Sequence, residues 1–172
     1  MKATVCLFAV FALFTAAADA QAPAADQLLA AAKVKATTEH KAIFVHFGAS
    51  WCVWCRRLEA FLERPDIKPV FEKYFIPMKL VVQENAANKA LENPGAYALL
   101  VKLGGPSGLP YSAFLDAQGA LTINSKHLGQ NIGYPGKPDE ILWFVHMMKK
   151  AAPTIAAADV KIIETALTES AK

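Results

Sequence analysis

Cys52 and Cys55 are the residues of this chain whose type and spacing most clearly indicate chemistry. They lie where an apolar, strand-like run over residues 42–48 gives way to a helix-like sequence. A Cys-x-x-Cys pair at such a junction can close a small disulfide ring and can present its first thiol to the unpaired amides of a helix N-terminus, which favours the thiolate. A bridge across so short a loop constrains the unfolded chain little. The placement therefore favours thiol–disulfide exchange over a structural staple.

The N-terminal segment has the features of a secretory signal peptide. A short positive start, Met1-Lys2, precedes a continuous apolar stretch over residues 5–14, and small residues then lead to the A-x-A-like sequence Ala18-Asp19-Ala20. The apolar stretch is shorter than the roughly 18 residues expected of a membrane-spanning helix, which disfavours an uncleaved anchor. We expect residues 1–20 to be cut off after Ala20, with cleavage after Ala18 as the alternative, and the mature protein to be secreted or periplasmic.

The mature chain predicted in this way is a single domain over residues 21–172. Hydrophobic residues make up 54% of the sequence and charged residues 19%, which disfavours extended disorder. The net charge of +3 is too small and too dispersed to indicate nucleic acid as a partner. Cys6 would leave with the signal peptide, so in an oxidising compartment the one disulfide available within the chain joins Cys52 to Cys55.

The order of predicted elements describes an α/β sandwich. We expect helices over residues 24–38, 52–64, 70–74, 139–150 and 154–170, and two helical pieces within 86–103 broken at residues 93–95. Strands are predicted over residues 42–48, 75–82, 111–115 and 121–124, with a loop over 129–138. The first two strands would form a parallel pair with a helical crossover, and the last two an antiparallel hairpin at one side of that pair.

This order of elements, together with the segment Phe44–Cys55, resembles the thioredoxin superfamily, and within it the secreted or periplasmic thioredoxin-like proteins of bacteria. The resemblance covers about residues 41–150. One motif is Trp51-Cys52-Val53-Trp54-Cys55, and the other is the segment 108–116, whose Pro110 is placed like the family's proline that stands beside the disulfide. The resemblance implies a three-layer sandwich with a central mixed sheet flanked by helices, to which residues 154–170 add an extra C-terminal helix.

The same resemblance implies a thiol–disulfide oxidoreductase that exchanges disulfides with proteins and uses no added cofactor. Cys52 would attack a substrate disulfide from the helix N-terminus, and Cys55 would resolve the mixed disulfide. Trp51, Leu109 and Pro110 would contact the substrate, with a cis Leu109–Pro110 bond and the backbone of Leu109 free to pair with an extended segment. The alternative is that Trp51 is a buried core residue with no role in binding substrate.

Three further residues are candidates for tuning the redox chemistry. His46 occupies the position, six residues before Cys52, where thioredoxins carry a buried acid. It would act as a base for Cys55 or, when protonated, stabilise a thiolate; a satisfied core histidine is the alternative. Trp54, between the cysteines, is bulkier than is common in this family. No charged group separates the cysteines, which favours a reducing or intermediate potential, whereas Arg56 favours the thiolate and acts against this.

Metal and haem chemistry are disfavoured, whereas one other function stays open as an alternative. No second Cys pair or suitably spaced histidines accompany the pair for zinc, and Arg56 stands where haem attachment needs histidine, so we expect no metal and no cofactor. The rival function is a thioredoxin-fold binding module or chaperone with a structural or vestigial disulfide. The expected partners are protein thiols and disulfides, with a redox protein for recycling. An apolar stripe over residues 160–167 would cover the core or form a dimer contact.

Overall fold

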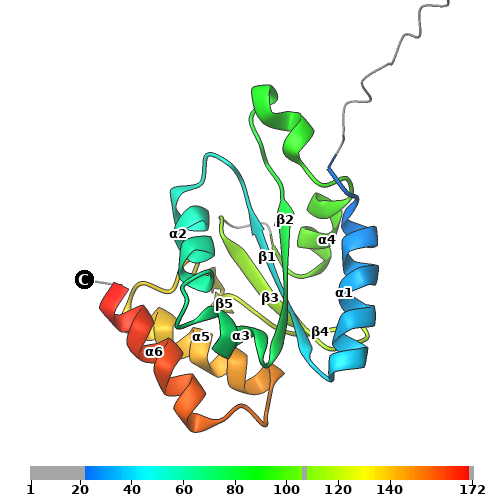
Figure 1. Ribbon diagram of the computed structural model, residues 1–172. Coiled ribbons are helices and arrows are strands. Elements are labelled where there is room, and N and C mark those ends of the chain that lie inside the picture. The colour runs from blue at the N-terminus through cyan, green and yellow to red at the C-terminus, as the bar shows by residue number, and fades with distance from the viewer. Residues whose placement is uncertain (1–21, 106–107, 171–172) are drawn as a thin grey trace, which may run out of the picture.

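The structure is a computed structural model that describes residues 22–105 and 108–170; the predicted signal peptide, residues 1–20, lies outside them. Four strands form the main sheet and helices enclose it (Figure 1). In chain order the elements are α1 (Ala25–Glu39), β1 (Ala42–Gly48), α2 (Val53–Leu62), α3 (Lys68–Glu72), β2 (Phe75–Val81), the 3₁₀ helix η1 (Ala86–Leu91), α4 (Ala96–Lys102), β3 (Tyr111–Leu115), β4 (Leu121–Asn124), β5 (Lys126–His127), β6 (Gln130–Asn131), α5 (Pro138–Ala151) and α6 (Ala157–Ser170).

The main sheet is mixed, with the strand order β2-β1-β3-β4. Strand β1 pairs in parallel with β2 and antiparallel with β3, and β3 continues into β4 through a hairpin. In the hairpin turn, the Asp116 carboxylate accepts bonds of 2.9 and 2.8 Å from the amides of Gln118 and Ala120. The predicted parallel pair with an antiparallel hairpin at one side is thus confirmed.

The helices cover both faces of this sheet. Figure 1 shows α1 and α4 against one face, and α2, α3, α5 and α6 on the other. Strand β1 is buried along its whole length, as a strand sandwiched between two helical layers must be. Because side chains alternate along a strand, Ile43, Val45 and Phe47 join the cluster under α1 and α4, whereas Phe44 faces α2 and α5. The predicted three-layer sandwich is confirmed.

An aromatic cluster fills the layer between the sheet and α5. Phe44 packs against Phe71, Phe114 and Phe144 with ring centroids 5.1, 4.9 and 6.1 Å apart. These side chains are almost completely excluded from solvent, and such pairs contribute about 0.5–1.5 kcal/mol each beyond the area that they bury. The cluster also packs against α2, which matters because α2 carries Cys55 and begins directly after Cys52.

The extra C-terminal helix packs against the same layer. The predicted apolar stripe of α6, which includes Val160, Ile163 and Leu167, is buried in the core of this chain and is not left free for a dimer contact. Asp159 holds the start of the helix, accepting bonds of 2.6 Å from the Tyr74 hydroxyl and 2.8 Å from the Lys73 ammonium. Within the described residues, no helix is both long and apolar enough to cross a membrane.

Some predicted boundaries were wrong. The last helix begins at Ala157 and not at residue 154, and α2 begins at Val53 and ends at Leu62, short of residue 64. The stretch 129–138 is not all loop, because Gln130 and Asn131 form β6 and pair with β5. Strands of two residues are too short to show an alternating pattern, so this hairpin had no signal in the sequence.

Candidate active site

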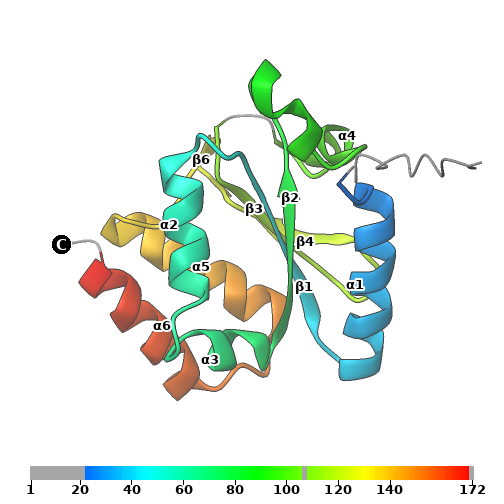
Figure 2. The same ribbon diagram turned by 45° about the horizontal axis from the view of Figure 1, so that its top comes forward.

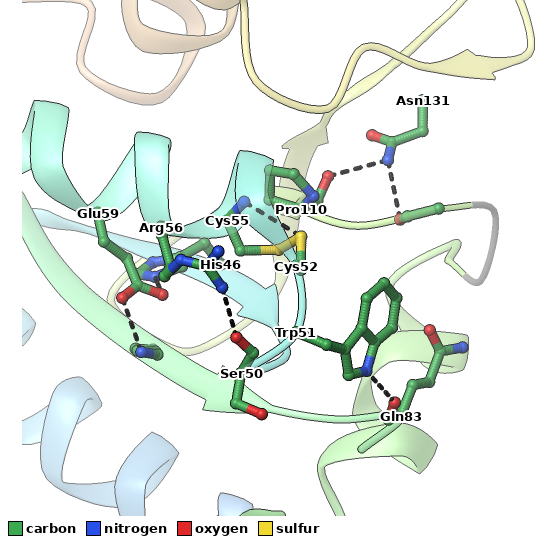
Figure 3. The surroundings of a disulfide bond; sticks show 12 residues. His46, Ser50, Trp51, Cys52, Cys55, Arg56, Glu59, Gln83, Pro110 and Asn131 are labelled. Carbon is green, nitrogen blue, oxygen red and sulfur yellow. Dashed lines mark hydrogen bonds and ion pairs between the residues drawn. A yellow bond between two sulfur atoms is a disulfide. The ribbon is translucent and has the colours of Figure 1, made fainter. Parts of the chain in front are cut away.

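The two cysteines lie at the edge of the sheet where β1 ends and the chain enters α2 (Figure 3). They form a disulfide with an S–S distance of 2.07 Å. Cys52 is the N-cap residue of α2, and its sulfur accepts a 3.1 Å bond from the Cys55 amide. The predicted position of Cys52 at a helix N-terminus is therefore confirmed. A thiolate formed there would meet an amide donor and the positive end of the helix dipole.

Close packing between β1 and the first turn of α2 is possible because residue 48 is glycine. A Cβ placed on Gly48 would lie 3.1 Å from the Cys55 Cβ and 3.3 Å from its sulfur. The same Cβ would lie 3.8 Å from Oε1 of Glu59, so Cys55 and Glu59 both border this one position. Cys55 is fully buried at this contact, whereas Cys52 is 4% exposed. Of the two cysteines, Cys52 is thus the one that keeps some exposed surface.

The loop before β3 lies against the disulfide. Its Leu109–Pro110 peptide bond is cis, as expected, and Leu109 packs against Cys52, Cys55 and Ala49. In the described part of the chain, the Leu109 amide and carbonyl have no hydrogen-bond partner. Among the described residues, these two backbone groups beside the disulfide are thus left unpaired.

Asn131 of β6 holds this loop in place. Its side-chain Nδ2 donates to the carbonyls of Gly108 and Pro110 at 3.0 and 2.9 Å, so the two bonds flank Leu109 on either side (Figure 3). Its Oδ1 accepts a 2.7 Å bond from the Ser125 hydroxyl, which fixes the orientation of the amide. The short β5–β6 hairpin therefore serves to orient the loop that carries Pro110.

The loop before Cys52 is held by the segment between β2 and α4, which projects beyond this edge of the sheet (Figure 2). The Glu84 carboxylate is 8% exposed and accepts bonds from the Ser50 amide at 2.5 Å and the Ser50 hydroxyl at 2.7 Å. Arg56 donates a 2.6 Å bond to the Ser50 carbonyl. Arg56 thus contacts the loop that positions Cys52.

Both tryptophans of the motif are half exposed. Trp51 is 51% exposed, and its indole N–H donates a 2.8 Å bond to the carbonyl of Gln83. The alternative interpretation of Trp51 as a core residue is therefore wrong. Trp54 is 53% exposed and stacks on Tyr134 with ring centroids 6.0 Å apart. Two large apolar surfaces flank the disulfide and are open to solvent.

His46 is buried below the first turn of α2, on the face of β1 that α2 covers. It is 5% exposed, and neither ring nitrogen has a hydrogen-bond partner among the described residues. It is therefore not the satisfied core histidine that we considered. Its Nε2 lies 3.8 Å from Oε1 of Glu59, whose other oxygen accepts a 2.8 Å bond from Lys79. A cavity of about 290 Å³ reaches His46 between α2 and β2.

The environment of Glu59 keeps it ionised. The imidazole of His46 and the ammonium group of Lys79 lower the pKa of Glu59 to about 2, against the effect of burial, which raises it. Thioredoxins place an acid at the strand position of His46, as noted above. Here the strand supplies the imidazole and α2 supplies the carboxylate, one turn after Cys55. An imidazole beside a carboxylate, rather than a lone acid, therefore lies beneath Cys55.

Sequence reasoning missed three polar residues of the site: Glu59, Glu84 and Asn131. Glu59 could have been found, because residues four apart on a helix share a face and Glu59 follows Cys55 by four. Glu84 and Asn131 gave no local signal, since their contacts cross 34 and 21–23 residues of sequence. The predicted residues Trp51, Cys52, Cys55, Leu109 and Pro110 do lie together at one edge of the sheet, with His46 beneath them.

Fold and site together define a thioredoxin-type α/β protein with a Cys-x-x-Cys disulfide beside a cis-proline loop. The family model described as thioredoxin-like matches residues 24–117, more than half of the chain. The chain therefore belongs to the thioredoxin-like family. Among curated protein sequences, none matches this chain significantly.

The chain is also similar to solved structures. The disulphide isomerase of Xylella fastidiosa is 18% identical, with 92% of this chain and 99% of that chain covered and a TM-score of 0.52. The C-terminal domain of DsbD from Neisseria meningitidis, in its oxidised form, is 21% identical over 74% of this chain and 99% of that chain, with a TM-score of 0.45. The first likeness supports the shared fold, and at this identity it says no more.

Proposed function

We propose that this protein is a thiol–disulfide oxidoreductase that exchanges disulfides with protein substrates through Cys52 and Cys55. The observation that carries the proposal is the position of the disulfide: Cys52 caps α2, and Leu109 packs on the cluster of the two cysteines with a backbone that is unpaired among the described residues. A substrate strand that pairs with Leu109 brings its own cysteine to Cys52. A disulfide that only stabilised the fold would need neither a position at a helix N-terminus nor the unpaired backbone of Leu109.

The exchange proceeds in two balanced steps. In the reduced protein, the Cys52 thiolate attacks one sulfur of a substrate disulfide, forms a mixed disulfide and releases the other substrate sulfur as a thiolate. Cys55 then loses its proton, attacks the Cys52 sulfur and displaces the second substrate thiolate. The substrate disulfide gains two electrons and the Cys52–Cys55 pair loses two. A substrate dithiol drives the same steps in reverse.

His46 and Glu59 are suited to the proton step at Cys55. A neutral imidazole can accept the Cys55 proton, and the ionised Glu59 carboxylate 3.8 Å from Nε2 stabilises the imidazolium that results. The cavity that reaches His46 gives this proton a route to solvent. Trp51, Trp54 and Arg56 act around the pair, the two indoles by contact with substrate and Arg56 by its hold on the loop before Cys52.

We further infer that the protein works in an oxidising compartment, as a secreted or periplasmic protein, and that another redox protein recycles it. The potential should be reducing or intermediate, between about −180 and −270 mV, because no charged group between the cysteines stabilises the thiolate. The rival function is a binding module or chaperone with a structural disulfide. The exposed indoles favour contact with other proteins under either function.

Two measurements separate these functions. The first is the Cys52–Cys55 reduction potential in a glutathione buffer. The second is a Cys55→Ser variant, which should accumulate mixed disulfides with substrate proteins because nothing resolves them, with Cys52→Ser as the matched control that accumulates none. A potential far below about −300 mV, together with no captured protein, would refute the oxidoreductase and favour the structural disulfide.

A further inference from the structure

A groove of about 340 Å³ opens beside the disulfide on the side of α5. Its lining includes Leu109, Trp54, Arg57, Tyr134, Lys137 and Glu140. Leu109 belongs both to this groove and to the cluster around Cys52 and Cys55. A peptide segment that pairs with Leu109 would therefore lie at the border of this groove.

One wall of the groove is aromatic and carries a cation. Trp54 and Tyr134 stack with an interplanar angle of 23°. The Arg57 guanidinium lies 5.4 Å from the centre of the Trp54 ring and 5.0 Å from that of Tyr134, a cation–π arrangement with both. Arg57 also donates to the carbonyl of Ser170 at the end of α6, and the Tyr134 hydroxyl bonds the Ser170 hydroxyl at 2.8 Å. These contacts hold the wall in place before any ligand binds.

The charges of the groove favour an anion. The Glu140 carboxylate is already hydrogen-bonded within the chain. It accepts 3.0 Å bonds from the amides of Gly136 and Lys137 and lies 3.2 Å from the Lys137 ammonium. Within the described ranges, no ion pair includes Arg57. Arg57 and Lys137 against Glu140 leave one net positive charge, and the planar Arg57 side chain matches a carboxylate.

Resting on the proposed function, we propose that this groove is a specificity subsite for polypeptides that carry an aromatic and an acidic side chain beside their reactive cysteine. The aromatic side chain packs on the exposed face of Trp54, and the carboxylate pairs with Arg57, with Lys137 at the rim. Such a segment contacts both the aromatic surface and the cation of the wall, whereas Arg57 and Lys137 would repel a basic segment.

The test compares disulfide-bonded model peptides that differ only beside the cysteine, which is flanked by Phe-Glu, Phe-Lys or Ala-Glu. Rate constants for oxidation of the reduced protein are measured by stopped-flow fluorescence. We expect the Phe-Glu peptide to react about two- to fivefold faster than the Phe-Lys peptide, the range expected of one partly exposed ion pair. The advantage should shrink as salt is added, since exposed charges are screened.

Variants assign the effect to the groove. Arg57→Gln should bring the ratio of Phe-Glu to Phe-Lys rates close to one, and Trp54→Ala should remove the advantage of Phe-Glu over Ala-Glu. Arg64→Gln is the matched control: it makes the same change on an arginine that pairs with Asp66 and lies outside the groove, so the ratios should stay. If Arg57→Gln disturbs folding, judged by circular dichroism, Lys137→Gln tests the same charge from the 75% exposed rim.

Equal rates for the three peptides, or a preference that survives both Arg57→Gln and Lys137→Gln, would overturn the subsite while leaving disulfide exchange intact. If no peptide reacts and Cys55→Ser captures no protein, the proposed function fails and the subsite fails with it.

Discussion

The carboxylate of Glu59 allows a prediction with both a sign and a size. His46 and Lys79 lower its pKa to about 2 from 4.5. At about 1.4 kcal/mol per pH unit this corresponds to about 3 kcal/mol of stability at neutral pH. That value is a ceiling, because the side chain is 29% exposed and water screens its pairs. We expect a contribution of about 1–2 kcal/mol, which Glu59→Gln should remove.

The pH range of this contribution follows from its sign. The pKa is lower in the folded protein than in the unfolded chain, so the stabilisation is present above about pH 4.5 and is lost as the pH falls towards 2. Urea unfolding of the oxidised protein at pH values between 7 and 2.5 measures it. The wild type should lose about 1–2 kcal/mol more than Glu59→Gln between pH 5 and pH 2.5.

The control is Glu63→Gln, at the C-terminal end of α2, where the side chain is 66% exposed and, among the described residues, bonds Lys68 alone. Its unfolding free energy should follow the wild type at every pH. Parallel curves for the wild type and Glu59→Gln would refute the reasoning, because they would mean that the contacts with His46 and Lys79 do not distinguish the folded from the unfolded state.

Three further predictions concern the loops around the disulfide. Asn131→Ala removes the two hydrogen bonds on either side of Leu109. We expect the free energy of unfolding in urea to fall by about 1–3 kcal/mol and the KM for protein disulfides to rise. An unchanged KM would contradict the role of Asn131 in positioning the loop. His46→Ala should change the pH profile of the resolving step, measured by quenched-flow decay of a mixed disulfide to Cys52; an unchanged profile removes His46 from the mechanism. Glu84→Gln weakens the bonds to Ser50 and should lower the free energy of unfolding in urea by about 1–2 kcal/mol. An unchanged free energy of unfolding would mean that Glu84 does not hold this loop.

The sequence was sufficient for the sheet and for the reactive pair because their signals are local. The apolar run 42–48 predicted β1, and the Cys-x-x-Cys pair at its end predicted that Cys52 lies at a helix N-terminus, where the structure has it as the N-cap residue. The cis Leu109–Pro110 bond came from family resemblance, since any X-Pro bond taken alone is usually trans.

The residues that hold the loops around the disulfide could not be predicted from local sequence signals. Glu84 and Asn131 act on loops that only the folded sheet brings near them, and β6, which carries Asn131, is two residues long. Tyr134 lies in a stretch that the sequence marked as loop, and its stacking on Trp54 depends on where α5 begins. Long-range contacts of single side chains leave no periodic trace in a sequence.

The bonds from Ser170 to Arg57 and Tyr134 have a practical consequence for anyone who produces this protein. The end of α6 buttresses the aromatic wall beside the disulfide, so a purification tag or fusion partner attached directly after Ser170 would begin close to the groove. Such an attachment would crowd the approach of a substrate and bias measured rates. Any handle for purification or surface immobilisation therefore belongs ahead of α1, whose first residue, Ala25, donates to the Pro94 carbonyl on the face of the sheet away from α6.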